Sequence, residues 1–327
     1  VLGGMGNPMI AKNMLQPRLC ECLADSPSPT LIQQLSDELE LKGVVRMPAL
    51  VDGETLRGMQ TEFAIRLSRM RWNNIDGFER TEKYRKYVQD VLSLHQGFMD
   101  VALHPLVKGV LEKYIGPRFA LCEAKGWESL PTNYDFHGWH GDMWFDKSKV
   151  TDTIPREIKL CCYLTDVTSG AFQYITGSHG KIWPHNLSRE EVAQLPMDCK
   201  QDFLAPAGTV ILFDTSGIHR QAIPVLEPRQ AFFYNYHDPS YPIMPEEAEY
   251  YRYHPLMLNA AFLGGLSAED CRILGFGDKT NYQAGNVRPS PYPRLQSFLQ
   301  GVYTSYLHVD ILRERIVARL RRLFGAK

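Results

Sequence analysis

Two short segments of this 327-residue chain carry side chains that bind divalent metals in proteins. The first is DFHGWHGDMWFD, residues 135–146, in which one glycine separates His140 from Asp142. Residues i and i+2 lie on the same face of a strand, so this imidazole and this carboxylate would point to a common place. The pair has a second interpretation, a polar kink in an aromatic strand whose histidine only hydrogen-bonds a neighbour. A metal site therefore requires another ligand elsewhere in the chain.

The segment GTVILFDTSGIHRQAIPVLEPR, residues 208–229, supplies that ligand. Its apolar run TVILF predicts a buried strand, and His219 follows the polar turn DTSG. Two histidines and one carboxylate on one side of a metal leave three positions open, which is typical of non-haem Fe(II) oxygenases. Arg229, ten residues after His219, offers a planar and permanently charged guanidinium. Such a group suits the carboxylate of a dicarboxylate cosubstrate.

The elements that would position these residues change in character along the chain. Residues 1–29 predict a loose segment, and residues 30–117 predict helices, one of them over 80–97, around the short strand GVVRMPALV. Residues 118–240 contain short β-branched or aromatic runs between Gly, Pro, Asp and Ser clusters, which is typical of a sandwich or barrel. Residues 241–327 return to helical periodicity. We therefore expect one α+β domain with a strand-rich core between two helical regions. The runs that predict core strands are RFALCEAKGWESL, EIKLCCYLTDV, AFQYIT, GTVILFD and RQAFFYNYH.

In their order along residues 43–237, these segments resemble the phytanoyl-CoA dioxygenase family of Fe(II)/2-oxoglutarate-dependent oxygenases. WHGDMW is similar to the family's HxD segment, and AGTVILFDTSGIHRQAIPVLEPRQAF is similar to its distal histidine and arginine. The remaining likeness lies in GVVRMPALVDGETLRGMQTEF, HPLVKGVLEKYIGP and YLTDVTSGAFQYITGSHG. The resemblance implies a double-stranded β-helix, a jelly-roll or cupin-like core, flanked by N- and C-terminal helices.

The resemblance also implies Fe(II), 2-oxoglutarate and O₂ as the reacting partners of the protein. His140, Asp142 and His219 would bind the iron, and Arg229 would bind the distal carboxylate of 2-oxoglutarate. The expected reaction releases succinate and CO₂ and oxidises a C–H bond of a small molecule, as in specialised-metabolite biosynthesis. Related halogenases have a small residue in place of the carboxylate. Asp142 therefore favours hydroxylation, desaturation or cyclisation over halogenation.

Two neighbours of the proposed ligands could contact the cosubstrate. Gln221 lies two residues after His219 and could hydrogen-bond a carboxylate from the same strand face. Lys159, in EIKLCCYLT, would be a buried cation that needs an anion, such as 2-oxoglutarate or an acidic substrate, if its face is internal. The alternative places Lys159 at a strand end, where it reaches solvent.

Four further side chains have both a functional and a structural interpretation. His137 could contact cosubstrate or substrate, or lie at the rim of the site. Trp144 shares the face of His140 and Asp142 if that strand continues, so it is a candidate substrate wall; its alternative is core packing. Tyr163, on the face of Lys159, is also a candidate for substrate contact. His237 could be a fourth ligand, but its position at a strand end favours a hydrogen-bonded structural residue.

Composition limits the other classes of partner. The net charge of −1 gives no basis for binding nucleic acid. The sequence contains neither an apolar run of the ~20 residues that a membrane span needs nor a signal peptide. Seven cysteines without a CxxC pair indicate reduced thiols. We expect a cytoplasmic monomer or homodimer without membrane partners.

Two other functions stay open: a barrel metalloenzyme that does not use 2-oxoglutarate, and a non-catalytic binding protein with the same fold.

Overall fold

The computed structural model describes residues 27–69, 84–135, 137–150, 153–183, 187–248 and 256–276, together with separate positions between 298 and 320. Contacts divide the chain into two compact units, Val1–Asn281 and Tyr282–Lys327. The separate positions of the second unit are helical, as predicted. The loose segment predicted for 1–29 lies outside the described residues up to position 26. Among the described residues, no helix is both long and apolar enough to cross a membrane.

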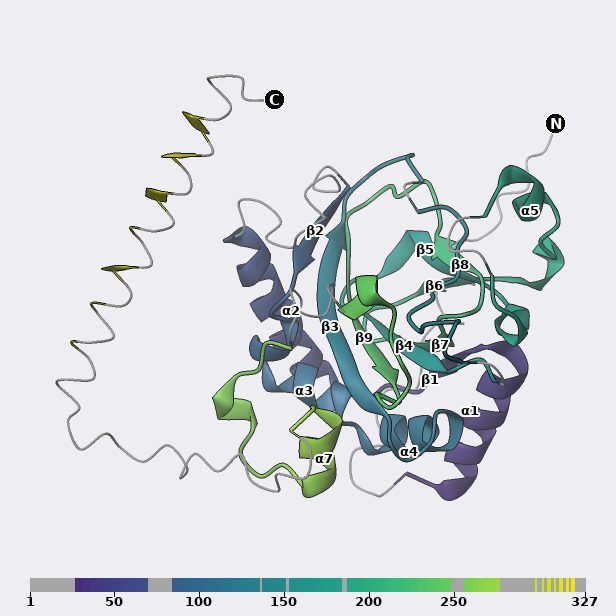
Figure 1. Cartoon of the computed structure of the whole chain (residues 1–327), viewed down its shortest axis with the longest axis horizontal. Coiled ribbons are helices and arrows are strands. Elements are labelled where there is room, and N and C mark those ends of the chain that lie inside the picture. The colour runs from purple at the N-terminus through teal and green to yellow at the C-terminus, as the bar shows by residue number, and fades with distance from the viewer. Residues whose placement is uncertain are drawn as a thin grey trace, which may run out of the picture. The chain divides into compact units, whose positions relative to one another are not determined.

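The first unit combines helices with two antiparallel sheets (Figure 1). The larger sheet has six strands in the order β1-β7-β4-β9-β3-β2. The smaller sheet has three strands in the order β6-β5-β8. The five strand runs expected in the core all form strands. The strands are β1 (Val44–Met47), β2 (Arg85–Val88), β3 (Ala120–Ser129), β4 (Glu157–Tyr163), β5 (Val167–Ile175), β6 (Lys200–Ala205), β7 (Val210–Asp214), β8 (His219–Gln221) and β9 (Arg229–His237).

Four helices cover the outer face of the six-stranded sheet (Figure 1). They are α1 (Pro29–Lys42), α2 (Gly53–Ser68), α3 (Gln96–Ala102) and α4 (Pro105–Tyr114). Asp52 begins α2 by accepting hydrogen bonds from two backbone N–H groups, and Gly43 ends α1 in the left-handed conformation. The shorter helices are η2 (Val91–Ser93), η3 (Ser178–Gly180), α5 (Arg189–Ala193), η4 (Met197–Cys199), η5 (Ala260–Phe262) and α7 (Ala268–Ile273).

Strand β4 of the large sheet is buried on both faces and shows how the sheet divides the core. Cys162 packs with Phe63 and other helical residues in the outer cluster. Its neighbour Cys161 packs in a second cluster with Phe172 and Phe203 of the small sheet. Successive side chains of a strand point to opposite faces, so one strand serves both layers. The inner face of the large sheet therefore lies against the small sheet.

The helix predicted for residues 80–97 is wrong in its central part. Residues 85–88 form β2, the edge strand that pairs with β3, and η2 and the start of α3 follow it. The run YRKYV has two aromatic residues and one β-branched residue, which favour a strand once a partner is present. This strand directs Arg85 and Tyr87 towards the inner face of the sheet. Both residues therefore belong to the site.

Candidate metal centre and its cavity

His140 and His219 are held side by side by the backbone. The two residues form an isolated antiparallel bridge. His140 N–H donates to the carbonyl oxygen of His219 at 3.1 Å, and His219 N–H donates to that of His140 at 2.8 Å. Asp142 N–H donates to the carbonyl oxygen of Thr215 at 2.8 Å. The segment 140–144 is thus extended only locally and does not continue as the strand that the interpretation of Trp144 required.

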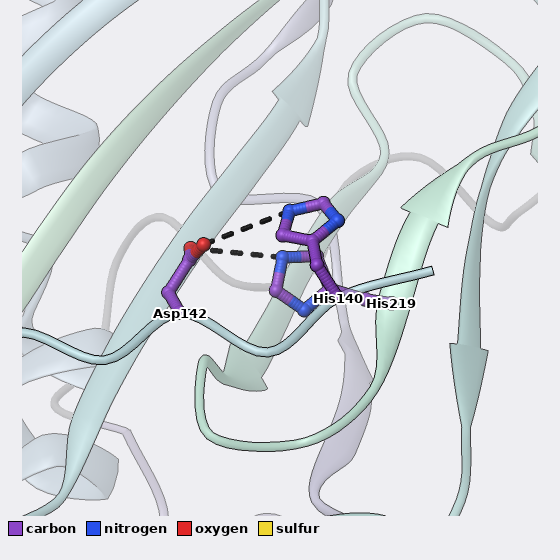
Figure 2. A group of neighbouring side chains, drawn as sticks. All are labelled: His140, Asp142 and His219. Atoms are coloured by element: carbon purple, nitrogen blue, oxygen red, sulfur yellow. Dashed lines mark ion pairs between the residues drawn. The ribbon is translucent and has the colours of Figure 1, made fainter. Parts of the chain in front are cut away.

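The side chains of His140, Asp142 and His219 converge on one point (Figure 2). One carboxylate oxygen of Asp142 lies 3.6 Å from Nε2 of His140, and the other lies 3.6 Å from Nε2 of His219. The potential ligand atoms of the three residues all lie within 4.8 Å of one another. A Cβ atom on Gly141 would lie 2.9 Å from the carbonyl oxygen of Ser216, which explains the glycine between the two ligands.

The hydrogen bonds of the two imidazoles set their tautomers. Nδ1 of His140 lies 3.0 Å from the carbonyl oxygen of Gly138, and Nδ1 of His219 lies 2.9 Å from that of Gly217. A carbonyl oxygen only accepts, so each Nδ1 carries a proton and each Nε2 is the nitrogen left to bind a metal. Both Nε2 atoms face the Asp142 carboxylate. A divalent cation fits this set of two imidazole nitrogens and one carboxylate.

The ionisation of the donors also fits a metal. Burial, together with the neighbouring His219, lowers the pKa of His140 to about 4. Burial opposes the ionisation of Asp142, but Lys159 and the two histidines outweigh it and hold its pKa well below the usual range. At neutral pH, His140 is therefore a neutral ligand and Asp142 is an anionic one.

Lys159 of β4 pairs with Asp142 rather than reaching solvent. Its Nζ lies 2.6 Å from Oδ2 of Asp142, and the lysine side chain is only 13% exposed. Burial favours neutral Lys159, but Asp142 outweighs it and raises the pKa of the amine. The interpretation of Lys159 as a solvated strand-end residue is therefore wrong. Its anionic partner within the described chain is the candidate metal ligand.

The three convergent side chains lie in a cavity of about 170 Å³ between the two sheets. The large sheet contributes Lys159 and the aromatic residues Trp127 and Phe233, whose rings stack with centroids 3.7 Å apart. The small sheet contributes Phe172 and Gln221. Aromatic walls around a few charged groups are typical of small-molecule sites.

Arg229 lies in the same cavity and has unused hydrogen-bond donors. The residue is 5% exposed, and Nη2 donates to Oε1 of Gln221 at 2.9 Å. Among the residues that the structure describes, Nε and Nη1 have no hydrogen-bond partner. Burial lowers the pKa of Arg229. A buried guanidinium with two open donors fits a planar carboxylate, which would supply both acceptors and charge.

Three candidates for substrate contact have different surroundings. His137 is exposed and lines the cavity, with its ring centroid 5.3 Å from that of His140. Trp144 is 3% exposed, and its ring stacks on that of His237 with the centroids 3.9 Å apart. It is not among the described residues that line the cavity. Tyr163 is fully buried, and its hydroxyl donates to the carbonyl oxygen of Phe203 at 3.0 Å. We therefore correct the substrate interpretation of Trp144 and Tyr163, since both pack in the interior.

The sequence analysis missed Arg85 and Arg220, which also line the cavity. Arg220, between His219 and Gln221 in β8, forms an ion pair with Asp135 at 3.0 Å. Arg85 enters from β2. The strand-like composition of YRKYV was the signal that could have placed Arg85 in a sheet.

His237 forms a buried ion pair with Glu157 at 3.1 Å, so it is a structural residue, as we expected. Burial opposes protonation of His237, but Cys122 and Glu157 outweigh it and raise the pKa to about 10. The folded pKa lies above the ordinary value of 6.5, so this stabilisation is complete below pH 6.5 and is lost as the pH rises through about 10.

The variant His237→Gln tests this pH dependence. We expect wild type to be more stable than the variant by about 3 kcal/mol at neutral to mildly acidic pH, because the change leaves Glu157 buried without a charged partner. The difference should shrink as the pH rises through the folded pKa. Urea unfolding of both proteins over this pH range measures it, and a difference independent of pH would contradict the assignment.

Comparison with solved structures shows a shared fold without a sequence match. No family model matches the chain, and no curated protein sequence matches it. The non-heme alpha ketoglutarate dependent epimerase SnoN from nogalamycin biosynthesis superposes with a TM-score of 0.51 and 17% identity, over 66% of this chain and 84% of that chain. HygX from Streptomyces hygroscopicus, with nickel, 2-oxoglutarate and hygromycin B bound, has a TM-score of 0.47 and 17% identity, over 64% of this chain and 88% of that chain. The SnoN superposition shows that the described helices and antiparallel sheets share that enzyme's fold.

Proposed function

We propose that the protein is an Fe(II)/2-oxoglutarate-dependent oxygenase that oxidises a C–H bond of a small molecule, on a double-stranded β-helix of the phytanoyl-CoA dioxygenase type. One observation carries the proposal: two imidazoles and a carboxylate converge in the cavity that also holds a buried arginine with open donors. The fold shared with SnoN, an alpha ketoglutarate dependent enzyme, supports it.

Each residue of the site has a definite part in this proposal. His140, Asp142 and His219 would hold Fe(II), and Arg229 would bind the distal carboxylate of 2-oxoglutarate. The bound iron and cosubstrate supply the oxidation of a substrate C–H bond by O₂, with release of succinate and CO₂. Lys159 holds the Asp142 carboxylate in place through its 2.6 Å ion pair.

The aromatic walls of the cavity would limit the access of water to the reacting groups. Because Asp142 supplies a carboxylate at the metal, we propose hydroxylation, desaturation or cyclisation as the outcome. We propose a small-molecule substrate, since the cavity is small and lies between the two sheets.

Anaerobic titration with Fe(II) and 2-oxoglutarate tests the proposal. Wild type should bind both and develop a visible absorption band. Arg229→Ala should weaken 2-oxoglutarate binding about 100-fold while leaving the binding of the metal alone intact, because truncating one partner of a buried charge pair costs about 2–5 kcal/mol. Isothermal titration with Mn(II) and then 2-oxoglutarate measures the two steps separately.

Arg46→Ala is the matched control, since Arg46 is an exposed arginine on β1. Metal binding without any affinity for 2-oxoglutarate would replace the proposal with a barrel metalloenzyme of another type. Failure to bind either Fe(II) or Mn(II) would favour a non-catalytic binding protein.

A further inference from the structure

Arg85, Ser129 and Arg229 form a row across three neighbouring strands. Arg85 of β2 is directly opposite Ser129 of β3, which is in turn directly opposite Arg229 of β9. Opposite residues of antiparallel strands place their side chains on the same face. The row therefore puts two guanidinium groups and a hydroxyl at one end of the inner face of the large sheet.

The three side chains of this row donate to a single atom of the other sheet, Oε1 of Gln221. Nη2 of Arg229 lies 2.9 Å from this oxygen, Oγ of Ser129 lies 3.0 Å from it, and Nη2 of Arg85 lies 3.1 Å from it. An amide oxygen has two lone pairs, so one acceptor here serves three donors. Arg229 keeps two further N–H groups without a described partner. The row therefore offers more donors than Gln221 can accept.

Arg85 is held in this position from two further directions. Its guanidinium lies 4.3 Å from the centroid of the Trp127 ring, and its Nη1 donates to the hydroxyl of Tyr87 at 3.0 Å. The residue is 5% exposed and lines the cavity. A stacked and hydrogen-bonded guanidinium loses little conformational freedom when an anion binds to it.

The charges of the row also favour an anion. Burial first, and then the positive charge of Arg85, lower the pKa of Arg229. Two buried guanidinium groups thus donate to the same neutral amide oxygen. A carboxylate supplies two acceptor oxygens and a negative charge, which suit the open donors of Arg229 and the neighbouring guanidinium of Arg85.

We propose that Arg85 is a second determinant of cosubstrate specificity, and that Arg85 and Arg229, aligned by Gln221, together bind the distal carboxylate of the dicarboxylate. This inference rests on the proposed function and deepens it. Arg229 alone would recognise any carboxylate that reaches it. With Arg85, the site selects 2-oxo acids whose second carboxylate reaches the row.

The variant Arg85→Ala, measured with two ligands, tests the proposal. The Mn(II)-loaded protein is titrated with 2-oxoglutarate and with pyruvate, which has the same 2-oxo acid end but no distal carboxylate. The dissociation constant for 2-oxoglutarate should rise about tenfold or more, because a hydrogen bond to a charged group contributes about 1.5–3 kcal/mol. Pyruvate binding should change by less than about twofold, because a change that touches only the distal site does not couple to the other end of the ligand.

Lys86→Ala is the matched control on the same strand. Lys86 lies next to Arg85 and pairs with Glu128 at 3.1 Å, outside the residues that line the cavity. Its removal should leave both dissociation constants unchanged. Arg85→Lys, which keeps the charge but not the fork, should have an intermediate affinity for 2-oxoglutarate. Equal weakening of both ligands would assign Arg85 a merely structural role and overturn the proposal.

Gln221→Glu provides a second test that does not remove a buried arginine. The change puts a carboxylate of the chain itself where the two arginines and Ser129 already donate. The variant should lose 2-oxoglutarate binding, keep Mn(II) binding, and melt at a higher temperature than wild type in the absence of ligand. Unimpaired binding of 2-oxoglutarate by Gln221→Glu would overturn the proposal.

The experiments separate this proposal from the one on which it rests. If wild type binds Mn(II) but not 2-oxoglutarate, the proposed function itself is wrong. If wild type binds 2-oxoglutarate and Arg85→Ala binds it equally well, only the role of Arg85 is wrong.

Discussion

Replacing His219 with alanine is expected to abolish turnover and to weaken the binding of Mn(II) or Fe(II) more than about 100-fold. Losing a residue that only hydrogen-bonds a metal ligand typically weakens metal binding roughly 10–100-fold, and losing a ligand itself should cost more. The change removes one of the convergent donors and leaves His140 and Asp142 as the remaining pair. Anaerobic isothermal titration measures the affinity directly, so the result does not depend on knowing the substrate.

The fold should survive this substitution, because the bonds that join the two segments are made by the backbone of His219. The metal-free variant should therefore melt close to wild type, whereas the increase in melting temperature on adding Mn(II) should disappear. His104→Ala is the matched control. Its imidazole accepts a hydrogen bond from Leu106 N–H at 3.2 Å and caps α4, so its loss should cost about 1 kcal/mol of stability without affecting metal binding. Unchanged Mn(II) affinity in His219→Ala would contradict the assignment of the metal centre.

Replacing Lys159 with methionine should lower the free energy of unfolding of the metal-free protein by about 3 kcal/mol, the lower end for a buried pair, because it leaves the partly buried Asp142 carboxylate without its cation. Asp142 has a folded pKa below its ordinary value of 3.8, so the stabilisation by this pair is present above pH 3.8 and is lost as the pH falls through the folded pKa. Urea unfolding near neutral pH measures the full effect.

Bound metal should restore part of the lost stability, since a divalent cation replaces the missing positive charge beside Asp142. The increase in melting temperature on adding Mn(II) should therefore be larger in Lys159→Met than in wild type. Lys86→Ala breaks an ion pair whose lysine is 42% exposed and should cost no more than about 1 kcal/mol. If Lys159→Met destabilises the protein no more than this control, the pair with Asp142 does not contribute as described.

The sequence predicted that His140 and Asp142 point to one place because the information for that pair is local, whereas His219 came from a separate segment of the chain. An i, i+2 pair shares a face over a few extended residues, whether or not a full strand forms. The same reasoning failed for Trp144, which required two further residues of continuous strand. The extended segment does not continue as a strand, and Trp144 turns into the interior to stack on His237.

Tyr163 and Arg85 show two other limits of sequence patterns. The alternation of side chains along β4 correctly placed Tyr163 on the inner face with Lys159. It does not predict how deeply a residue on that face is buried. The hydroxyl of Tyr163 hydrogen-bonds the backbone of the small sheet and does not reach the cavity. Arg85 was missed because the spacing of the apolar residues around it also fits a helix. Pairing with β3, more than 30 residues further along the chain, decides in favour of a strand.

The backbone bridge between His140 and His219 has a consequence for the thermodynamics of metal capture. Folding alone fixes the separation of these two donors, so an arriving ion does not have to order them. Asp142 is likewise restrained by its backbone bond to Thr215 and by Lys159. The ligands therefore lose little conformational entropy when a metal ion binds. The entropy change on binding should come mainly from water released by the ion.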